Sequence, residues 1–272
     1  MAKKKIIVIL LTALVFLSVA VLGVSAVYRV DEVTVVATTL SNEAKTEAEQ
    51  LQKRLEEVYA RKSMFFVERD LAEEIVEQFP YFRITDFEKS YPNRLIVDIR
   101  EDEETYAVPC LNAEEGYYIL GADGTVLGVR TDYSNRSDVT GKRKNVLITG
   151  LSVVGEKGGT LSGDTSLAYT LAFCQKVNEL LDGIQSNILQ VDVVKGGSLE
   201  DTVVLKLTTF EGVKIYVRNP SLHTEEKARL AIEKYFALSD SERTTGMIVA
   251  LDKNGTPSIA YSQEDEFEGI IN

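Results

Sequence analysis

The sequence contains little of the chemistry on which most enzymes and metal proteins depend. Among its 272 residues there is no tryptophan, and there are only one histidine and two cysteines. His223 is separated by dozens of residues from Cys110 and Cys174, which does not give the ligand spacing of a metal site. A Ser–His–Asp triad would need His223, yet no G-x-S-x-G nucleophile motif occurs. We therefore expect no catalytic residue, no cofactor and no metal.

Positive charge is scarce as well. The chain has 30 lysines and arginines against 42 aspartates and glutamates, which gives a formal net charge of −12. A field of this sign repels nucleic acid and anionic lipid headgroups, so both are excluded as expected partners. With two cysteines the chain is no disulfide-rich scaffold. We expect Cys110 and Cys174 to remain unpaired, with Cys174 buried on the apolar face of a predicted helix.

The N-terminus contrasts with this acidic composition. Lys3, Lys4 and Lys5 precede an apolar run from Ile6 to Val27. A helix of that length covers roughly the 30 Å hydrocarbon core of a bilayer, and flanking lysines favour the cytoplasmic side. The pattern predicts a cytoplasmic tip at residues 1–5 and a transmembrane helix at 6–27. The chain would then be a single-pass protein of the bacterial cell membrane with its C-terminal bulk outside the cytoplasm. A cleaved signal peptide, ending near Val24-Ser25-Ala26, is the alternative.

Residues 28–101 show the pattern of a small α+β domain. Ser41-Asn42-Glu43 is predicted to open its first helix, and Asp70 is predicted to be the N-cap of its second, which Pro80 closes. The expected order is strand, helix, helix, strand and strand, at Val30–Val36, 41–58, 70–80, Arg83–Lys89 and Leu95–Ile99.

Residues 102–261 are predicted to form a mixed or antiparallel β domain with two flanking helices. The helices are expected at Thr165–Leu181 and Thr224–Leu238. The strands are expected at Tyr106–Leu111, Tyr117–Leu120, Thr125–Val129, Ile188–Val194, Thr202–Thr209, Val213–Arg218, Met247–Leu251 and Ser258–Tyr261. Residues 131–145 are polar and predicted to be a mobile loop, and the glycine-rich stretch 155–163 a flexible linker. Residues 262–272 form an acidic C-terminal tail.

Two short patterns could carry chemistry. The run Glu101 to Glu104 could bind a divalent cation or supply a glycosidase pair, although a charged, solvated surface explains it more simply. Asn135-Arg136-Ser137 matches a glycosylation sequon, which a bacterial protein would leave unused. Neither pattern is expected to be a functional site.

Two strings in the first domain resemble a known module. Phe79-Pro80-Tyr81-Phe82 is followed by Tyr91-Pro92-Asn93-Arg94-Leu95-Ile96-Val97. These strings, in this order of elements, are similar to the POTRA domain of the FtsQ/DivIB family of bacterial cell-division proteins. The string from Tyr117 to Gly124 resembles the first hairpin of that family's β domain. The lysine-rich helix and the string from Met247 to Asp252 together resemble its closing helix–strand unit.

The resemblance implies a non-enzymatic scaffold of the divisome, located at the division septum. Members of the family bind coiled-coil membrane proteins of the FtsL and FtsB/DivIC type, contact other divisome proteins, and help to regulate septal peptidoglycan synthesis. The final helix and strands of the β domain receive the partner in such proteins. Here those elements would be Thr224–Leu238 and Ser258–Tyr261. The alternative is an exported, membrane-anchored cell-wall hydrolase or transferase, for which the sequence supplies no convergent catalytic residues.

The candidate partner-binding residues are Tyr235, Ile259 and Tyr261. A terminal strand has no later strand to cover its outer edge, so its backbone groups can pair with another protein. Ile259 and Tyr261 are two residues apart and point to one face, and tyrosine is a common interface residue. In the alternative interpretation both side chains fill the core and the acidic tail protects the edge.

Overall fold

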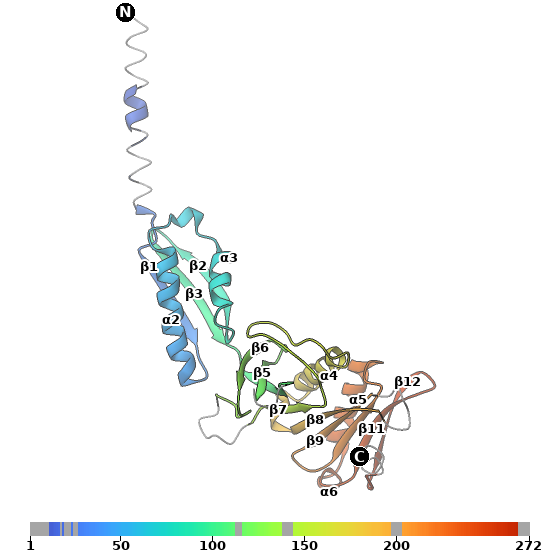
Figure 1. Cartoon of the computed structure of the whole chain (residues 1–272). Coiled ribbons are helices and arrows are strands. Elements are labelled where there is room, and N and C mark those ends of the chain that lie inside the picture. The colour runs from blue at the N-terminus through green and yellow to red at the C-terminus, as the bar shows by residue number, and fades with distance from the viewer. Residues whose placement is uncertain are drawn as a thin grey trace, which may run out of the picture. The chain divides into compact units, whose positions relative to one another are not determined.

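The chain divides into two compact units, Met1–Glu101 and Asp102–Asn272. A computed structural model describes residues 11–16, 18, 23, 27–111, 116–137, 144–196 and 203–265. The units are coloured blue to green and green to red in Figure 1. Their boundary coincides with the one placed from the sequence after residue 101.

The prediction of a transmembrane helix is corrected by the structure. None of the helices formed by the described residues is both long and apolar enough to cross a membrane. Crossing needs about 20 consecutive apolar helical residues. The predictions of a transmembrane helix at 6–27, and of a single-pass membrane protein, are therefore contradicted. The predicted cytoplasmic tip at 1–5 and the Val24-Ser25-Ala26 site lie outside the described residues.

The first unit contains the predicted order of strand, helix, helix, strand and strand, which is confirmed. Its elements are β1 (Glu32–Thr38), α2 (Asn42–Tyr59), the short turn η1 (Met64–Phe66), α3 (Arg69–Val76), β2 (Phe82–Ser90) and β3 (Arg94–Glu101). The sheet order is β1-β3-β2, with β1 parallel and β2 antiparallel to the central β3. Both helices pack on one face of this sheet (Figure 1).

Local sequence explains how the helices of the first unit begin. The run Ser41-Asn42-Glu43 opens α2, as predicted. Ser41 is its N-cap, and the Ser41 hydroxyl accepts a hydrogen bond from the N–H of Ala44 at 3.1 Å. The prediction for Asp70 is wrong, because α3 already begins at Arg69 with Glu68 at the cap position. Asp70 lies in the first turn instead, where a carboxylate favourably faces the positive end of the helix dipole.

The second unit is built on one large sheet. Its elements are β4 (Glu104–Pro109), β5 (Tyr117–Gly121), β6 (Val126–Arg130), β7 (Val146–Thr149), α4 (Leu167–Leu180), η3 (Ile184–Ser186), β8 (Ile188–Lys195), β9 (Val203–Thr209), β10 (Lys214–Arg218), α5 (Thr224–Ala237), α6 (Asp240–Arg243), β11 (Met247–Lys253) and β12 (Thr256–Ser262). The nine strands follow the order β12-β11-β10-β9-β8-β7-β4-β5-β6. The sheet is mixed, because the pairs β4–β7, β7–β8 and β10–β11 are parallel.

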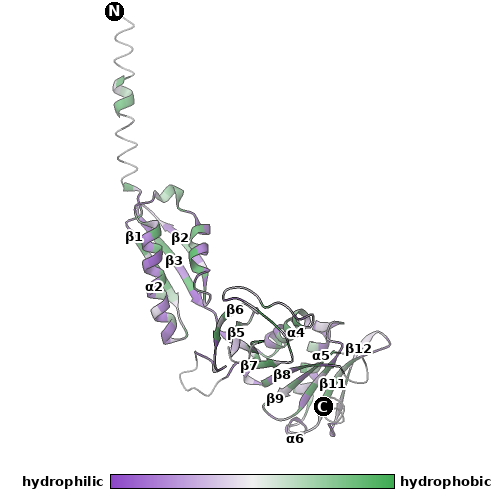
Figure 2. Ribbon diagram, in the orientation of Figure 1, coloured by the Kyte–Doolittle hydropathy of each residue, from purple (hydrophilic) through white to green (hydrophobic). Residues whose placement is uncertain are grey.

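The main core of the second unit lies between the sheet and its two long helices. Phe173 and Cys174 of α4 and Ala231 of α5 are buried against strand residues such as Val191 and Ile215. The strands carry green, hydrophobic residues beneath these helices in Figure 2. A smaller cluster of Val204, Tyr216, Met247 and Val249 forms a separate core. The helix at Thr224 begins at its predicted residue, and α5 packs on β11 and β12 at one end of the sheet.

The two expected loops are more ordered than predicted. The glycine-rich stretch is not a flexible linker, because Gly158 and Gly159 exchange backbone hydrogen bonds of 2.8 Å with Val126 of β6. It covers part of that end of the sheet. In the predicted mobile loop, Asn135 is buried and its amide donates to the carbonyl of Glu104 at 2.9 Å. Residues 138–143 of that loop lie outside the described residues.

Candidate functional site

One edge of the large sheet is formed by β12. Within the part of the chain that the structure describes, β12 pairs with β11 alone, from Met247 opposite Ser262 to Lys253 opposite Thr256. None of its seven residues is fully buried. The opposite end of the sheet, β6, is partly covered by the glycine-rich stretch. The edge of β12 therefore offers the longer run of backbone to a partner.

The turn before β12 determines which of its backbone groups point outward. Asn254 and Gly255 have φ values of +54° and +78°, as a two-residue type I′ hairpin turn requires. Lys253 and Thr256 flank this turn and form a hydrogen-bonded pair, and such pairs alternate along an antiparallel ladder. The N–H groups of Ile259 and Tyr261 therefore point away from β11. The third outward position is Pro257, which has no N–H and suits an edge strand.

The structure reconciles the two interpretations of Ile259 and Tyr261. Both side chains are half-buried and pack against the main core of the second unit, on the helix-covered face. The hydroxyl of Tyr261 donates weakly, at 3.3 Å, to the carbonyl of Glu242. The side chains thus belong to the core, as the alternative proposed. The outward backbone of the same residues is what a partner strand can use.

Tyr235 lies nearby on α5 but is not an open contact residue. It is only 3% exposed, and its hydroxyl donates to the Oε2 atom of Glu211 at 2.6 Å. The Arg243 guanidinium lies 5.3 Å from the centre of the Tyr235 ring and forms a 3.8 Å ion pair with Glu211. Burial, together with the hydrogen bond and the negative charge of Glu211, raises the pKa of Tyr235 to about 12. Tyr235 is therefore a buried residue that holds Glu211 and Arg243 in place.

Sequence reasoning missed several residues of this region that are exposed or half-buried. Phe236 is 52% exposed, and its ring is tilted by 55° against that of Tyr235, with ring centres 5.5 Å apart. Arg243 comes from α6, a helix that the sequence analysis did not predict. The Lys234 ammonium lies 5.9 Å from the centre of the Tyr261 ring. The capping box of Ser239 and Glu242 is the local signal that could have revealed α6.

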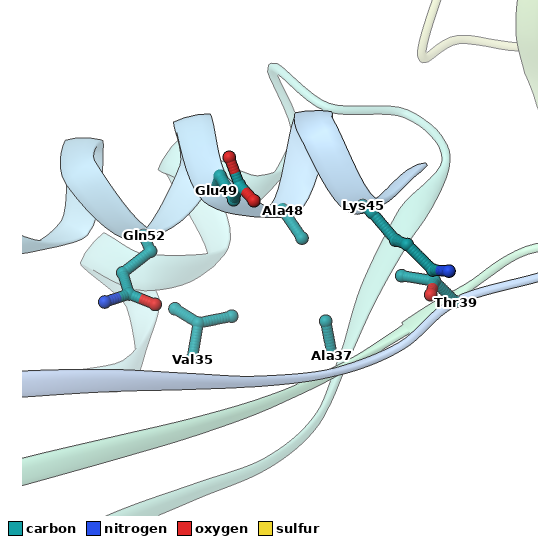
Figure 3. A pocket seen from close by; sticks show the side chains of 7 residues that line it. All are labelled: Val35, Ala37, Thr39, Lys45, Ala48, Glu49 and Gln52. Carbon is teal, nitrogen blue, oxygen red and sulfur yellow. The ribbon is translucent and has the colours of Figure 1, made fainter. Parts of the chain in front are cut away.

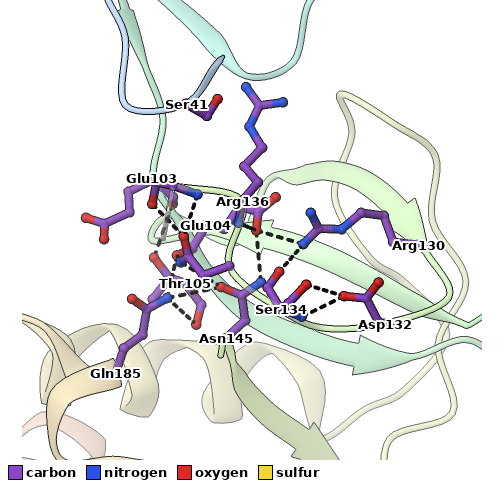
Figure 4. Close-up of polar contacts among 12 residues, drawn as sticks. Ser41, Glu103, Glu104, Thr105, Arg130, Asp132, Ser134, Arg136, Asn145 and Gln185 are labelled. Carbon is purple, nitrogen blue, oxygen red and sulfur yellow. Dashed lines mark hydrogen bonds and ion pairs between the residues drawn. The ribbon is translucent and has the colours of Figure 1, made fainter. Parts of the chain in front are cut away.

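The acidic run at 101–104 is only in part the solvated surface that was predicted, because Glu103 is exposed and Asp102 is half-buried, whereas the other two acids are buried. Glu101 is 3% exposed and Glu104 is 1% exposed. Within the second unit, one carboxylate oxygen of Glu104 accepts hydrogen bonds from Arg130 at 2.8 Å, from the Arg136 N–H at 3.0 Å and from Asn145 at 3.1 Å. Figure 4 shows these groups converging on Glu104. The Glu104 carboxylate can be buried because these donors compensate its charge. The same hydrogen bonds hold the loop that follows β6 in place.

The histidine, cysteine and acidic side chains of the described residues do not gather into a catalytic or metal-binding cluster. Among the residues that the structure describes, no cluster of three or more histidine, cysteine, aspartate or glutamate side chains could hold a metal ion. His223 is exposed at the N-terminus of α5, where its φ of +52° is left-handed. Cys110 and Cys174 are both buried, and they do not form a disulfide with each other, as expected. Burial raises the pKa of the Cys174 thiol to about 12, so it is no nucleophile at neutral pH.

The first unit also contains a groove. It lies between β1 and α2 (Figure 3) and has a volume of about 340 Å³. Val35, Ala37 and Ala48 form its floor, and the side chains of Lys45 and Glu49 lie at its rim. The groove is open and has no convergent set of titratable groups, so it lacks the features of an enclosed small-molecule site.

The chain was compared with known families and known proteins. No family model matches it, and no curated protein matches it.

Proposed function

We propose that this chain is a non-enzymatic scaffold of the bacterial division machinery, similar to the FtsQ/DivIB proteins that its sequence resembles. The observation that carries the proposal is the open edge of β12, which leaves the N–H groups of Ile259 and Tyr261 without a neighbouring strand among the described residues. Such an edge is compatible with a stable fold, and its unpaired backbone groups can pair with an added strand.

The proposed mode of binding is strand addition at this edge. An extended segment of the partner would accept hydrogen bonds from the N–H groups of Ile259 and Tyr261, and would donate to the outward carbonyl groups of the same two residues. Main-chain pairing supplies affinity, and side-chain contacts supply specificity. Phe236, which is exposed, and Arg243, which is partly buried, are the residues placed to supply such contacts, because large aromatic and arginine side chains dominate many interfaces.

The partners proposed are coiled-coil membrane proteins of the FtsL and FtsB/DivIC type. Through them, and through other divisome proteins, the scaffold would help to regulate septal peptidoglycan synthesis. Pro257 fits this role, because an edge that lacks one donor is less prone to pair with copies of itself. The two remaining donors still specify the register of one partner strand.

The experiment compares two substitutions at a single position. Ile259→Pro removes the outward N–H together with the side chain, whereas Ile259→Ala removes the side chain alone. Each full-length variant would be tested for co-purification with the candidate coiled-coil partners, after its fold is checked by circular dichroism. We expect Ile259→Pro to lose most of the capture and Ile259→Ala to retain most of it. Undiminished capture by Ile259→Pro would contradict strand addition.

A further inference from the structure

Four aromatic rings gather at one end of the first unit. Tyr28 lies 5.1 Å from Phe65 and 5.9 Å from Tyr91, and Phe65 lies 6.2 Å from Tyr91, measured between ring centres. Phe66 follows on the same turn. Phe65, Phe66 and Tyr91 are 54%, 82% and 55% exposed. We call these four residues the aromatic pole, and its turn between α2 and α3 is hydrophobic in Figure 2.

The aromatic pole is held by backbone hydrogen bonds. The N–H of Met64 donates to the carbonyl of Tyr28 at 2.9 Å, and the N–H of Val30 donates to that of Lys62 at 2.8 Å. The N–H of Asp31 donates to the carbonyl of Asn93, also at 2.9 Å. These bonds join three segments that are distant in sequence. The exposed rings are therefore fixed by the fold, and their exposure is not a property of a loose loop.

Positive charge surrounds the aromatic pole. Arg29, Arg61 and Lys62 are exposed in two of the three segments that carry its rings, and among the described residues none of the three forms an ion pair. Lys62 lies 5.5 Å from the centre of the Tyr59 ring. Two acids lie close by in the sequence: Asp31, which accepts a hydrogen bond from Asn93 at 2.9 Å, and exposed Glu68, two residues after Phe66. The pole is thus locally basic on a chain whose net charge is −12.

We propose that the aromatic pole docks on the surface of a bilayer that contains anionic lipids. Tyrosine and phenylalanine rings partition into the interface between headgroups and acyl chains, and arginine and lysine are attracted to anionic headgroups. Phe66, which is 82% exposed, presents nearly its whole ring to such an interface. The contact requires no helix that crosses the bilayer. It is also independent of the β12 edge.

The absence of tryptophan from the chain provides a direct test. Phe66→Trp would place the chain's single tryptophan at the aromatic pole, where it can be excited selectively over the tyrosines. Val36→Trp is the matched control, because Val36 is 51% exposed in the same unit but lies about 13 Å along β1 from Glu32. Interfacial insertion reaches only about 5–10 Å. Each variant would be mixed with vesicles of phosphatidylcholine and phosphatidylglycerol that carry brominated acyl chains.

We expect the emission of Phe66→Trp to shift to the blue and to be quenched by the brominated lipid, while that of Val36→Trp stays unchanged. An unshifted Phe66→Trp, or equal quenching of both variants, would overturn the proposal. In the Phe66→Trp background, Arg61→Gln with Lys62→Gln should weaken the partition into these vesicles by roughly 10- to 30-fold at low salt. Partition that is unaffected by this double substitution would contradict the role given to the basic residues.

Discussion

Glu101 and Ser41 are joined by two hydrogen bonds although 60 residues separate them. The Ser41 N–H donates to one carboxylate oxygen of Glu101 at 2.9 Å, and the Ser41 hydroxyl donates to the other at 2.7 Å. Because Ser41 is also the N-cap of α2, the last residue of β3 fixes the point where that helix begins. The helix cap and the sheet are thereby coupled.

Substitution of Glu101 should destabilise the first unit. Glu101→Gln keeps the size of the side chain but replaces charge-assisted hydrogen bonds to a buried site with neutral ones, which we expect to cost about 1–2 kcal/mol. Hydrogen exchange of the amides of α2 measures this loss, because it reports on the first unit separately. Glu103→Gln, at an exposed position two residues later, is the control and should change that exchange little. Equal effects of the two variants would contradict the coupling.

A buried ammonium group supports the end of the sheet where β12 lies. The Lys227 side chain is 0% exposed, and its Nζ atom donates to the carbonyl groups of Arg218 and Asn219 at 2.8 and 2.9 Å and to Asp252 at 2.6 Å. Removing one partner of such a buried pair leaves the other charge uncompensated. We expect Lys227→Met to lower the free energy of unfolding by about 3 kcal/mol, as measured in urea. Lys227→Met combined with Asp252→Asn should recover part of this loss, and a fully additive loss would show that the two groups do not interact.

The stability of the second unit should depend on pH through Asp164. Burial alone would raise its pKa, but the hydrogen bond with Lys195 and those from the N–H groups of Ser152 and Ser166 outweigh burial and lower the pKa to about 2. A lowered pKa stabilises the fold above the ordinary value of 3.8, and this contribution is lost as the pH falls toward 2. Asp164→Asn should therefore cost about 2 kcal/mol at pH 7.

The measurement for Asp164 is urea unfolding of the wild type and of Asp164→Asn at pH 7 and again between pH 2 and 3. The difference between the two proteins should be largest at neutral pH and should shrink in acid. A difference that does not change with pH would mean that the carboxylate stabilises the fold without its charge.

Local signals predicted much of the fold, and they failed where a residue's role depends on distant parts of the chain. Ser41 and the order of elements in the first unit were predictable, because caps and apolar periodicity act over a few residues. β7 was missed, since Val146–Thr149 is a four-residue strand whose partners β4 and β8 are far away in sequence. The apolar run at 6–27 was wrongly predicted to be a transmembrane helix.

The candidate site was predictable in part for the same reason. That β12 is the last strand can be read from the sequence, and so can the shared face of Ile259 and Tyr261. The burial of Glu101 and Glu104 could not be read, because it depends on donors such as Arg130 and Asn145 that only the folded chain brings together. The cluster of Tyr235, Glu211 and Arg243 is likewise assembled from three separate elements or turns.

Hydrogen exchange at individual residues of β12 tests the central proposal most directly. In the free protein the outward N–H groups of Ile259 and Tyr261 should exchange quickly, while those of Ser258 and Ala260, which face β11, are already protected. When a coiled-coil partner of the FtsB/DivIC type is added, we predict strong new protection at Ile259 and Tyr261 and little change at Ser258 and Ala260. A partner that binds while the N–H groups of Ile259 and Tyr261 keep exchanging at their free rate would contradict strand addition at this edge.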